Sequence, residues 1–381
     1  MTKRLTLALA AVAAGSAIAP AAQAAPLKLG FMDPAYQAEQ PARFWADAKI
    51  LRPQVLRYNV DWRGIAPRKP TVQRDPGDPR YDWAYLDDLV QGAAARRIPV
   101  VLTIHRTPGW AAKKPSYRAY LFNAIPNTVY FRNFVAAAAL RYSGRYDPDG
   151  DGIALPRVTR WEIWNEPNKY LYPVRTDRRG NIRRNAPITI GRDYSAMLNG
   201  AYAELKRRSR TNIVVAGGTA YSNFYRTALA PVNFLRLMKA GGAKFDVLAI
   251  HPYNSVPTQG IRQGTGSKGP NIYVANFGEY LRAADRLWPR KRYKVWLTEF
   301  GIQSYPDRFL GVPQAAQAAY LRASINIFKK RYKRVEMIVW FLIRDEVVRR
   351  PDGFAGWQSG LRTVGGKQKP AWRAWLAVRG R

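Results

Sequence analysis

Residues 158–167 read VTRWEIWNEP, an apolar run that ends abruptly in an amide, a carboxylate and a proline. The run has the length and the Val/Ile/Trp content of a buried strand, and Pro167 cannot continue a strand ladder. Residues 294–301 read KVWLTEFG and repeat the arrangement, with Glu299 near the end of the run. A carboxylate in such a place is costly to bury unless it is paired or used chemically. The two stretches therefore predict a buried sheet whose strand ends carry the chemistry.

Outward from these stretches, eight short apolar runs alternate with segments of helical period. The predicted strands are 27–31, 54–60, 99–104, 158–164, 213–216, 245–250, 294–300 and 335–341. The predicted helices are 42–50, 82–97, 128–142, 192–208, 232–240, 277–287, 313–332 and 370–377. Continuous apolar strands that alternate with helices are typical of a parallel sheet covered by helices, and eight of each is the count of an α/β, (β/α)8 TIM barrel.

The barrel is expected to form a single domain, because the chain shows neither an internal repeat nor an inter-domain linker. A doubly wound sheet is the alternative, but no dinucleotide-binding or P-loop motif comes directly after a predicted strand. The segments that follow strands are long, whereas most segments that lead from a helix to the next strand have only a few residues. Active sites of barrels lie at the carboxyl ends of the strands, so the long loops mark the expected site.

One helix-to-strand segment, Asp147–Gly152, resembles the first half of a calcium-binding loop. The twelfth position of such a loop would be Val158, so the bidentate carboxylate is missing and a tight turn is favoured. An ion bound there would lie on the face opposite the expected site, and its role would be structural.

The amino-acid composition excludes several kinds of catalytic and structural site. The 381 residues include no cysteine and two histidines, which excludes a disulfide scaffold, a cysteine nucleophile, an iron–sulfur cluster and thiolate zinc sites. We expect no metal and no cofactor, and carboxylates are left to carry the chemistry.

The first residues have the pattern of a secretory signal. Lys3 and Arg4 precede the apolar run Leu5–Ala14, and Ala22-Gln23-Ala24 supplies small residues at a cleavage position. We predict a signal peptide over 1–24, a secreted catalytic domain over 25–381, and no transmembrane segment. An uncleaved membrane anchor is the alternative, but the apolar run is short and Gly15 comes directly after it.

The chain is strongly basic, with 62 Lys and Arg against 26 Asp and Glu and a formal net charge of +36. The excess is scattered rather than gathered in one basic helix or arm, which favours a soluble basic surface over specific nucleic-acid binding. Weak binding to acidic polymers stays open as an alternative. We expect a monomer.

The fourth and seventh strands face each other across a barrel, so Glu166 and Glu299 converge at its mouth. Two carboxyl groups about 5–5.5 Å apart are what retaining glycoside hydrolysis requires. Asn165-Glu166-Pro167 and Thr298-Glu299-Phe300-Gly301, together with Arg57, His251-Pro252-Tyr253 and Trp340, resemble the clan A retaining glycoside hydrolases. The resemblance covers most of the chain after the signal.

The resemblance implies that Glu166 is the acid/base, Glu299 the nucleophile, and Asn165 a ligand of the sugar 2-hydroxyl. It further implies that Arg57 keeps Glu299 ionised and that Trp340 floors the subsite beside the cleaved bond. His251 and Tyr253 share a strand face and are expected to contact the sugar, as is His105 at the end of the third strand. The implied activity is an exported retaining O-glycosidase that cleaves β-glycosidic bonds of a poly- or oligosaccharide substrate.

Each assignment has an alternative. Glu166 and Glu299 could form structural ion pairs, Glu162 is a competing carboxylate deeper in the strand, and Arg57 could be only a counter-ion. His105 could be a rim hydrogen bonder, and Tyr253 could pack or orient Glu299. As a whole, the chain could be an inactive barrel that binds carbohydrate or polyanions.

The acid/base role requires a protonated Glu166, so we expect burial and the charge of Glu299 to raise its pKa. Aromatic residues in the long loops are candidate sugar platforms: Trp110, Tyr117, Tyr120, Tyr170, Tyr172 and Trp357. Lys113, Lys114 and Arg118 would favour an acidic sugar, although a neutral glycan is preferred.

Overall fold

The fold of the chain is an eight-stranded parallel barrel, seen in a computed structural model that describes residues 26–113, 124–171, 186–222, 229–253, 271–348 and 356–380. The strands are β1 (Lys28–Met32), β2 (Leu56–Asp61), β3 (Val100–His105), β4 (Arg160–Ile163), β5 (Ile213–Ala220), β6 (Val247–His251), β7 (Lys294–Phe300) and β8 (Val335–Phe341). They pair in chain order, and β8 closes the barrel on β1. The predicted (β/α)8 fold class is confirmed.

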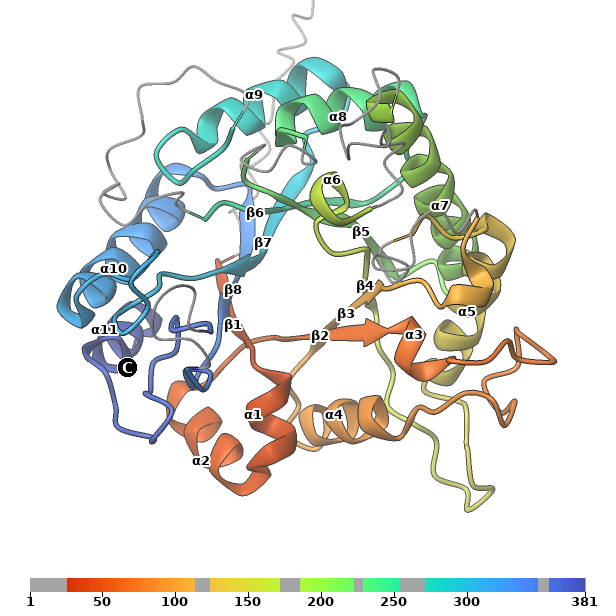
Figure 1. The fold of residues 1–381 in the computed structure, drawn as a ribbon, viewed down its shortest axis with the longest axis horizontal. Helices are drawn as coiled ribbons and strands as arrows, with labels where there is room; N and C mark the ends of the chain where they lie inside the picture. Colours follow the sequence, from red (N-terminus) through yellow and green to blue (C-terminus); the bar gives the residue numbers. More distant parts are fainter. Residues whose placement is uncertain are drawn as a thin grey trace, which may run out of the picture.

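A ring of helices surrounds the strands (Figure 1). Its members are α2 (Pro41–Leu51), α4 (Ala84–Ala94), α5 (Thr128–Arg141), α7 (Ala186–Arg208), α8 (Pro231–Ala240), α9 (Phe277–Leu287), α10 (Gln314–Arg331) and α11 (Pro370–Arg379). Each corresponds to a helix predicted from the sequence. Shorter helices, which the sequence patterns did not predict, lie in the segments after strands: α1 (Pro34–Glu39), α3 (Trp62–Ile65), η1 (Gly109–Ala111) and α6 (Pro167–Tyr170).

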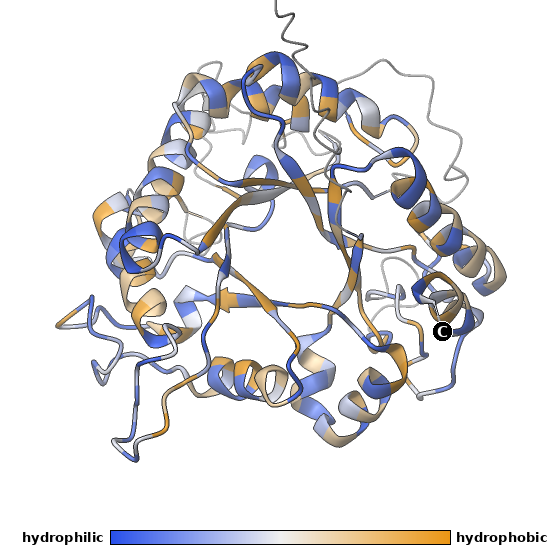
Figure 2. Cartoon of the chain, turned by 180° about the vertical axis from the view of Figure 1, so that it is seen from behind, coloured by the Kyte–Doolittle hydropathy of each residue, from blue (hydrophilic) through white to orange (hydrophobic). Residues whose placement is uncertain are grey.

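Two apolar layers hold the barrel together. The inner layer fills the barrel with alternate strand residues, among them Val101, Val215, Trp296 and Met337. The other face of each strand packs against the helices in a much larger cluster. The surrounding helices therefore carry both hydrophobic and hydrophilic residues (Figure 2). Helix in the described residues is nowhere long and apolar enough to cross a membrane.

The Asp147–Gly152 segment forms a turn that is held by its own first residue. The Asp147 carboxylate accepts hydrogen bonds from the backbone N–H groups of Asp149, Gly150 and Gly152 at 2.7–3.2 Å. These bonds hold the pKa of Asp147 below its ordinary value. Among the described residues, no group of three or more His, Asp and Glu side chains is arranged to hold a metal ion. The predicted signal peptide lies outside the described residues.

Asp33 links the segments that follow the first and the last strand of the barrel. Its side chain follows β1 and accepts hydrogen bonds from the backbone N–H groups of Ile343 and Arg344, which follow β8, each at 2.9 Å. It also accepts from the N–H of Tyr36 in α1 at 3.2 Å. Burial raises the pKa of Asp33 to about 6 although these N–H groups oppose the rise. One carboxylate thus satisfies three backbone groups where the barrel closes.

We expect Asp33→Ala to lower the free energy of unfolding by about 2–4 kcal/mol, because it leaves buried N–H groups without an acceptor. Urea denaturation measures the loss. Glu39→Ala is the matched control, since Glu39 pairs with Arg344 nearby but its side chain is 61% exposed; its effect should stay within about 0.5 kcal/mol. Equal losses in the two variants would contradict the role given to Asp33.

Candidate active site

Arg57 lies at the centre of the barrel mouth, fully buried on β2. Its Nε donates to Glu162 Oε2 at 2.8 Å, its Nη1 to Glu299 Oε2 at 2.9 Å, and its Nη2 to Asn165 Oδ1 at 2.7 Å. One guanidinium therefore holds side chains from β4, from the segment after it, and from β7. The prediction that Arg57 lies beside Glu299 agrees with this geometry, and the same residue is also the counter-ion of Glu162.

Glu162 is the buried partner on which this arrangement rests. Its Oε2 accepts from Arg57 and from Thr103 Oγ1 at 2.6 Å, and its Oε1 accepts from Thr298 Oγ1 at 2.6 Å and from the N–H of Gly218 at 2.9 Å. Burial raises the pKa of Glu162, but the charge of Arg57 and these hydrogen bonds outweigh it and hold the pKa below its ordinary value. Four donors and full burial make Glu162 a structural anion, and they leave no room for substrate.

Glu299 faces the barrel mouth, although regular alternation of side chains along β7 would turn it outward. Regular alternation along the strand predicts that Glu299 shares a face with Val295 and Leu297, but these two residues point outward into the helix-packed cluster, so this prediction is wrong. The pairing of β7 with β8 shifts register between Leu297 and Phe300. This irregularity turns Glu299 inward, where its Oε2 meets Arg57 and its Oε1 accepts from Tyr253 Oη at 3.0 Å.

Glu166 enters the mouth from a strained backbone. It has φ +45° in the left-handed region, at the start of α6, and its N–H donates to the carbonyl of Gly218 at 3.0 Å. A non-glycine residue held there is unfavourable by about 1–3 kcal/mol and is typical of functional sites. The carboxylate meets two partners: His251 Nδ1 lies 3.2 Å from its Oε1, and Lys169 Nζ lies 3.4 Å from its Oε2.

His251 is fully buried beneath Glu166, so the prediction that it contacts a sugar is not supported by its position. Its Nε2 lies 3.0 Å from Thr298 Oγ1. Gly218 makes this packing possible, because a Cβ at that residue would lie 2.1 Å from His251 Nε2. His251 thus orients Glu166 from behind, and Tyr253 is the member of the predicted pair that reaches the carboxylate of Glu299.

The hydrogen bonds define how many protons this region holds. Thr298 has one hydroxyl hydrogen and donates it to Glu162, so Thr298 Oγ1 accepts from His251 Nε2–H. The contact between His251 Nδ1 and Glu166 Oε1 then needs a second hydrogen between them. A hydrogen bond between His251 and Glu166 therefore requires one proton in addition to that on Nε2, carried on Nδ1 or on Oε1.

The expected rise in the pKa of Glu166 is wrong. Burial does act in that direction, but the hydrogen bond with His251 and the ammonium of Lys169 outweigh it and lower the pKa of Glu166. Lys169 was not predicted as a site residue, although its position three residues after Glu166 puts it on the same side of a helical turn.

His105 lies at the end of β3, half-buried beside the mouth. Burial lowers its pKa to about 3, and nearby Arg106 and Arg57 act in the same direction against Asp61. The imidazole is therefore neutral at ordinary pH and carries one N–H donor and one acceptor.

Trp340 does not lie at the mouth, which corrects its predicted role as a subsite floor. Trp340 is the register partner of Phe31 in β1 and of Phe300 in β7. Its side chain is fully buried in the apolar layer between the strands and the helices. Its indole Nε1 donates to the carbonyl of Ser359 at 2.9 Å. Trp357 is instead an aromatic side chain beside the site, because it is partly exposed and packs against Tyr253 with ring centroids 6.2 Å apart.

The remaining candidates are dispersed. Trp110 packs edge-on to Trp62 and donates to the carbonyl of Ala66, so it belongs to the wall of its loop. Lys113 pairs with Asp193 at 3.0 Å. The others lie outside the described residues or have undescribed side chains: Lys114, Tyr117, Arg118, Tyr120, Tyr170 and Tyr172.

Comparisons with known proteins support the fold. No protein-family model and no curated protein sequence matches the chain. Among solved structures, a family 39 glycoside hydrolase from Bacteroides cellulosilyticus WH2 is similar with a TM-score of 0.66 and 19% identity over 93% of this chain and 63% of that one. This chain thus spans less than two thirds of that protein.

Two further solved structures show the same fold. A family 39 β-xylosidase from Caulobacter crescentus has a TM-score of 0.56 and 17% identity over 93% of this chain and 71% of that one. An intracellular xylanase from Thermoanaerobacterium saccharolyticum has a TM-score of 0.54 and 14% identity over 92% and 95%. The chain shares the (β/α)8 fold of these glycoside hydrolases, as the resemblance to clan A predicts.

We expect Glu162→Gln to lower the free energy of unfolding by about 3–5 kcal/mol, because it leaves Arg57 buried without its main counter-ion. Glu299→Gln also removes a carboxylate from Arg57, but the Glu299 side chain keeps 12% exposure and Arg57 retains its fully buried partner Glu162, so this substitution should cost less than about 1 kcal/mol. Chemical denaturation of both variants measures the difference. A Glu162→Gln variant as stable as Glu299→Gln would refute the structural role of Glu162.

Proposed function

We propose that this chain is an exported retaining O-glycoside hydrolase that cleaves β-glycosidic bonds of poly- or oligosaccharides. One observation carries the proposal: two carboxyl groups at one barrel mouth have different partners. Glu299 accepts from a guanidinium and a phenol, whereas Glu166 contacts the imidazole of His251 at 3.2 Å and the ammonium of Lys169 at 3.4 Å. Two carboxyl groups in such different environments are the arrangement that glycoside hydrolysis uses for a nucleophile and an acid.

In the first step, Glu299 attacks the anomeric carbon, and the bond to the leaving oxygen breaks as that oxygen takes the proton of the Glu166–His251 pair. Arg57 supplies a positive charge 2.9 Å from Glu299 Oε2 and so favours the carboxylate form that attacks. In the second step, a water molecule gives a proton to Glu166, and its oxygen replaces Glu299 at the anomeric carbon. Two inversions retain the anomeric configuration.

Neighbouring groups have supporting roles in this proposal. Arg57 holds the Asn165 carbonyl oxygen at 2.7 Å, so the amide NH₂ is the group left to donate to a sugar hydroxyl. Trp357 and Tyr253 offer an aromatic surface beside Glu299. His105, kept neutral, adds a hydrogen-bonding group at the rim.

The pattern over residues 1–24 supports export. The ion pair of Lys113 with Asp193 makes this lysine less available to an acidic sugar, which favours a neutral glycan. The β-xylosidase and the xylanase among the similar structures make aryl β-xylosides and xylo-oligosaccharides the first substrates to test. Proton NMR of the earliest product is the decisive experiment, and an inverted anomer would overturn the double displacement.

We expect Glu299→Ala to reduce turnover by at least about a thousandfold and added azide to restore it, with a glycosyl azide of the opposite anomeric configuration as the product. Glu166→Ala should impair substrates with poor leaving groups by about 10²–10⁴-fold and activated aryl glycosides far less, because only the former need the acid. Steady-state kinetics on both substrate types measure this. Equal losses on both types would remove Glu166 from the acid role.

We expect Lys169→Met to move the alkaline limb of the kcat/KM profile to higher pH. The ammonium of Lys169 lowers the pKa of Glu166, so removing it favours the protonated form of the pair and the acid survives to higher pH. Lys113→Met is the control, because that lysine pairs with Asp193 instead and should leave the limb unchanged. A limb that stays in place or moves to lower pH in Lys169→Met would exclude the Glu166–His251 pair as its source.

A further inference from the structure

Positive charge gathers on the barrel face opposite the candidate site. Seven connections lead from a helix to the next strand, all lie on that face, and all are described. Each contains at least one basic residue, and together they hold twelve basic and four acidic residues, an excess of eight positive charges. The basic residues are Arg52, Arg96, Arg97, Arg145, Arg157, Arg210, Lys244, Arg290, Lys291, Arg292, Lys333 and Arg334.

Most of this charge is open to solvent. Eleven of the twelve side chains are exposed, and the exception, Arg334, is the one of the twelve that forms an ion pair with a described carboxylate, that of Asp285. The topology thus places one group of cations together on a single face of the barrel.

Stabilisation of helix ends explains only part of the excess. Eight helices end on this face, and each carries about half a negative charge at its C-terminus. That amounts to about four negative charges, half of the excess in the connections. Further cations lie in the last turn of α7, where Lys206 pairs with Asp246 and Arg207 with Glu204, while Arg208 is exposed. The remainder is available to an external anion.

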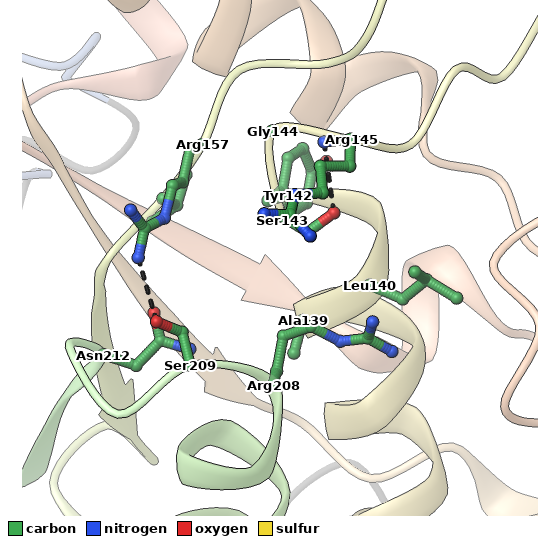
Figure 3. Close-up of a pocket in the computed structure, with 11 residues that line it drawn as sticks. Ala139, Leu140, Tyr142, Ser143, Gly144, Arg145, Arg157, Arg208, Ser209 and Asn212 are labelled. Carbon is green, nitrogen blue, oxygen red and sulfur yellow. Dashed lines mark hydrogen bonds between the residues drawn. The ribbon is translucent and has the colours of Figure 1, made fainter.

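A pocket of about 400 Å³ opens within this face, between the end of α5 and the end of α7. Its lining includes Arg145, Arg157 and Arg208 and contains no carboxylate. Figure 3 shows the Arg157 guanidinium directed at Ser209, to which it donates a hydrogen bond of 3.0 Å. The volume lies within the range of about 300–1,000 Å³ that small-molecule sites occupy, and it exceeds what a single inorganic anion needs.

The pocket also contains polar side chains, since Ser143, Ser209 and Asn212 line it beside the three arginines. Ser209 accepts from Arg157 and Asn212 donates to the carbonyl of Leu205, so a sugar hydroxyl would use the hydrogen-bonding capacity that these bonds leave. Arginine binds carboxylates through two parallel hydrogen bonds, while hydroxyl and amide side chains bind neutral hydroxyls. Burial and the charges of Arg207 and Arg74 lower the pKa of Arg208, a crowding of cations that an anion would relieve.

We propose that this face is a second, non-catalytic binding surface for an acidic polysaccharide, and that the pocket lined by Arg145, Arg157 and Arg208 anchors one of its uronate units. The neighbouring cations then follow the polymer by long-range attraction. The surface lies on the side of the barrel away from Glu166 and Glu299, so bound polymer leaves the catalytic mouth free.

The test measures binding of the full chain to polygalacturonate by fluorescence anisotropy while sodium chloride rises from about 0.1 to 1 M, which shortens the Debye length from ~10 Å to ~3 Å. Arg145→Gln, Arg157→Gln and Arg208→Gln are combined in one variant. The matched control combines Arg63→Gln, Arg68→Gln and Arg308→Gln, which removes the same charge from exposed arginines on the opposite face.

We expect salt-dependent binding that weakens by about tenfold or more in the pocket variant and by less than about threefold in the control. Hydrolysis of an aryl glycoside and the thermal midpoint should be unchanged in both variants, which separates lost binding from lost folding and from failure of the proposed glycosidase. Equal weakening in both variants would overturn the pocket. Absence of polygalacturonate binding would overturn the proposal, as would tighter binding of duplex DNA or phosphatidylglycerol vesicles.

Discussion

The buried ion pair between Arg57 and Glu162 determines the arrangement of the whole barrel mouth. A charge so deep in an apolar interior persists only with its hydrogen bonds satisfied, and each partner recruits others to meet that demand. Glu162 draws in Thr103, Thr298 and the backbone of Gly218. Arg57 extends the network to Glu299 and Asn165. A carboxylate beneath the mouth thereby helps to orient the groups that we assign to the chemistry.

Much of the fold could be predicted from the sequence because the strands of a parallel barrel are buried on both faces and appear as continuous apolar runs. The same property concealed the direction of individual side chains. With apolar residues at nearly every position, nothing in the run 335–341 distinguishes the outward Trp340 from an inward residue. The shift of register in β7 was equally hidden, because it depends on pairing with β8.

The site was predictable as far as residue types at strand ends reveal it. Glu166, Glu299, Arg57 and Asn165 are brought together as expected. The expected contact of His251 with the sugar is not supported, because a histidine at a strand end is equally consistent with contact to substrate and with support of Glu166 from beneath. The direction of the pKa shift of Glu166 depended on the hydrogen bond with His251 and on Lys169, whose ammonium reaches the carboxylate because α6 begins directly after Glu166. Similarly, the basic residues are scattered along the chain and gather only through the topology.

Gly218 affects how hydrogen on His251 exchanges with solvent. The backbone of β5 closes over His251 so tightly that a single methyl group would not fit, and the imidazole has no exposed surface. Water therefore cannot reach either ring nitrogen directly. Hydrogen on this imidazole therefore exchanges with solvent through the carboxyl group of Glu166, although the ring has two nitrogen atoms. A ligand bound over the Glu166 carboxyl group would isolate the proton on His251 from bulk water for as long as the ligand stays bound.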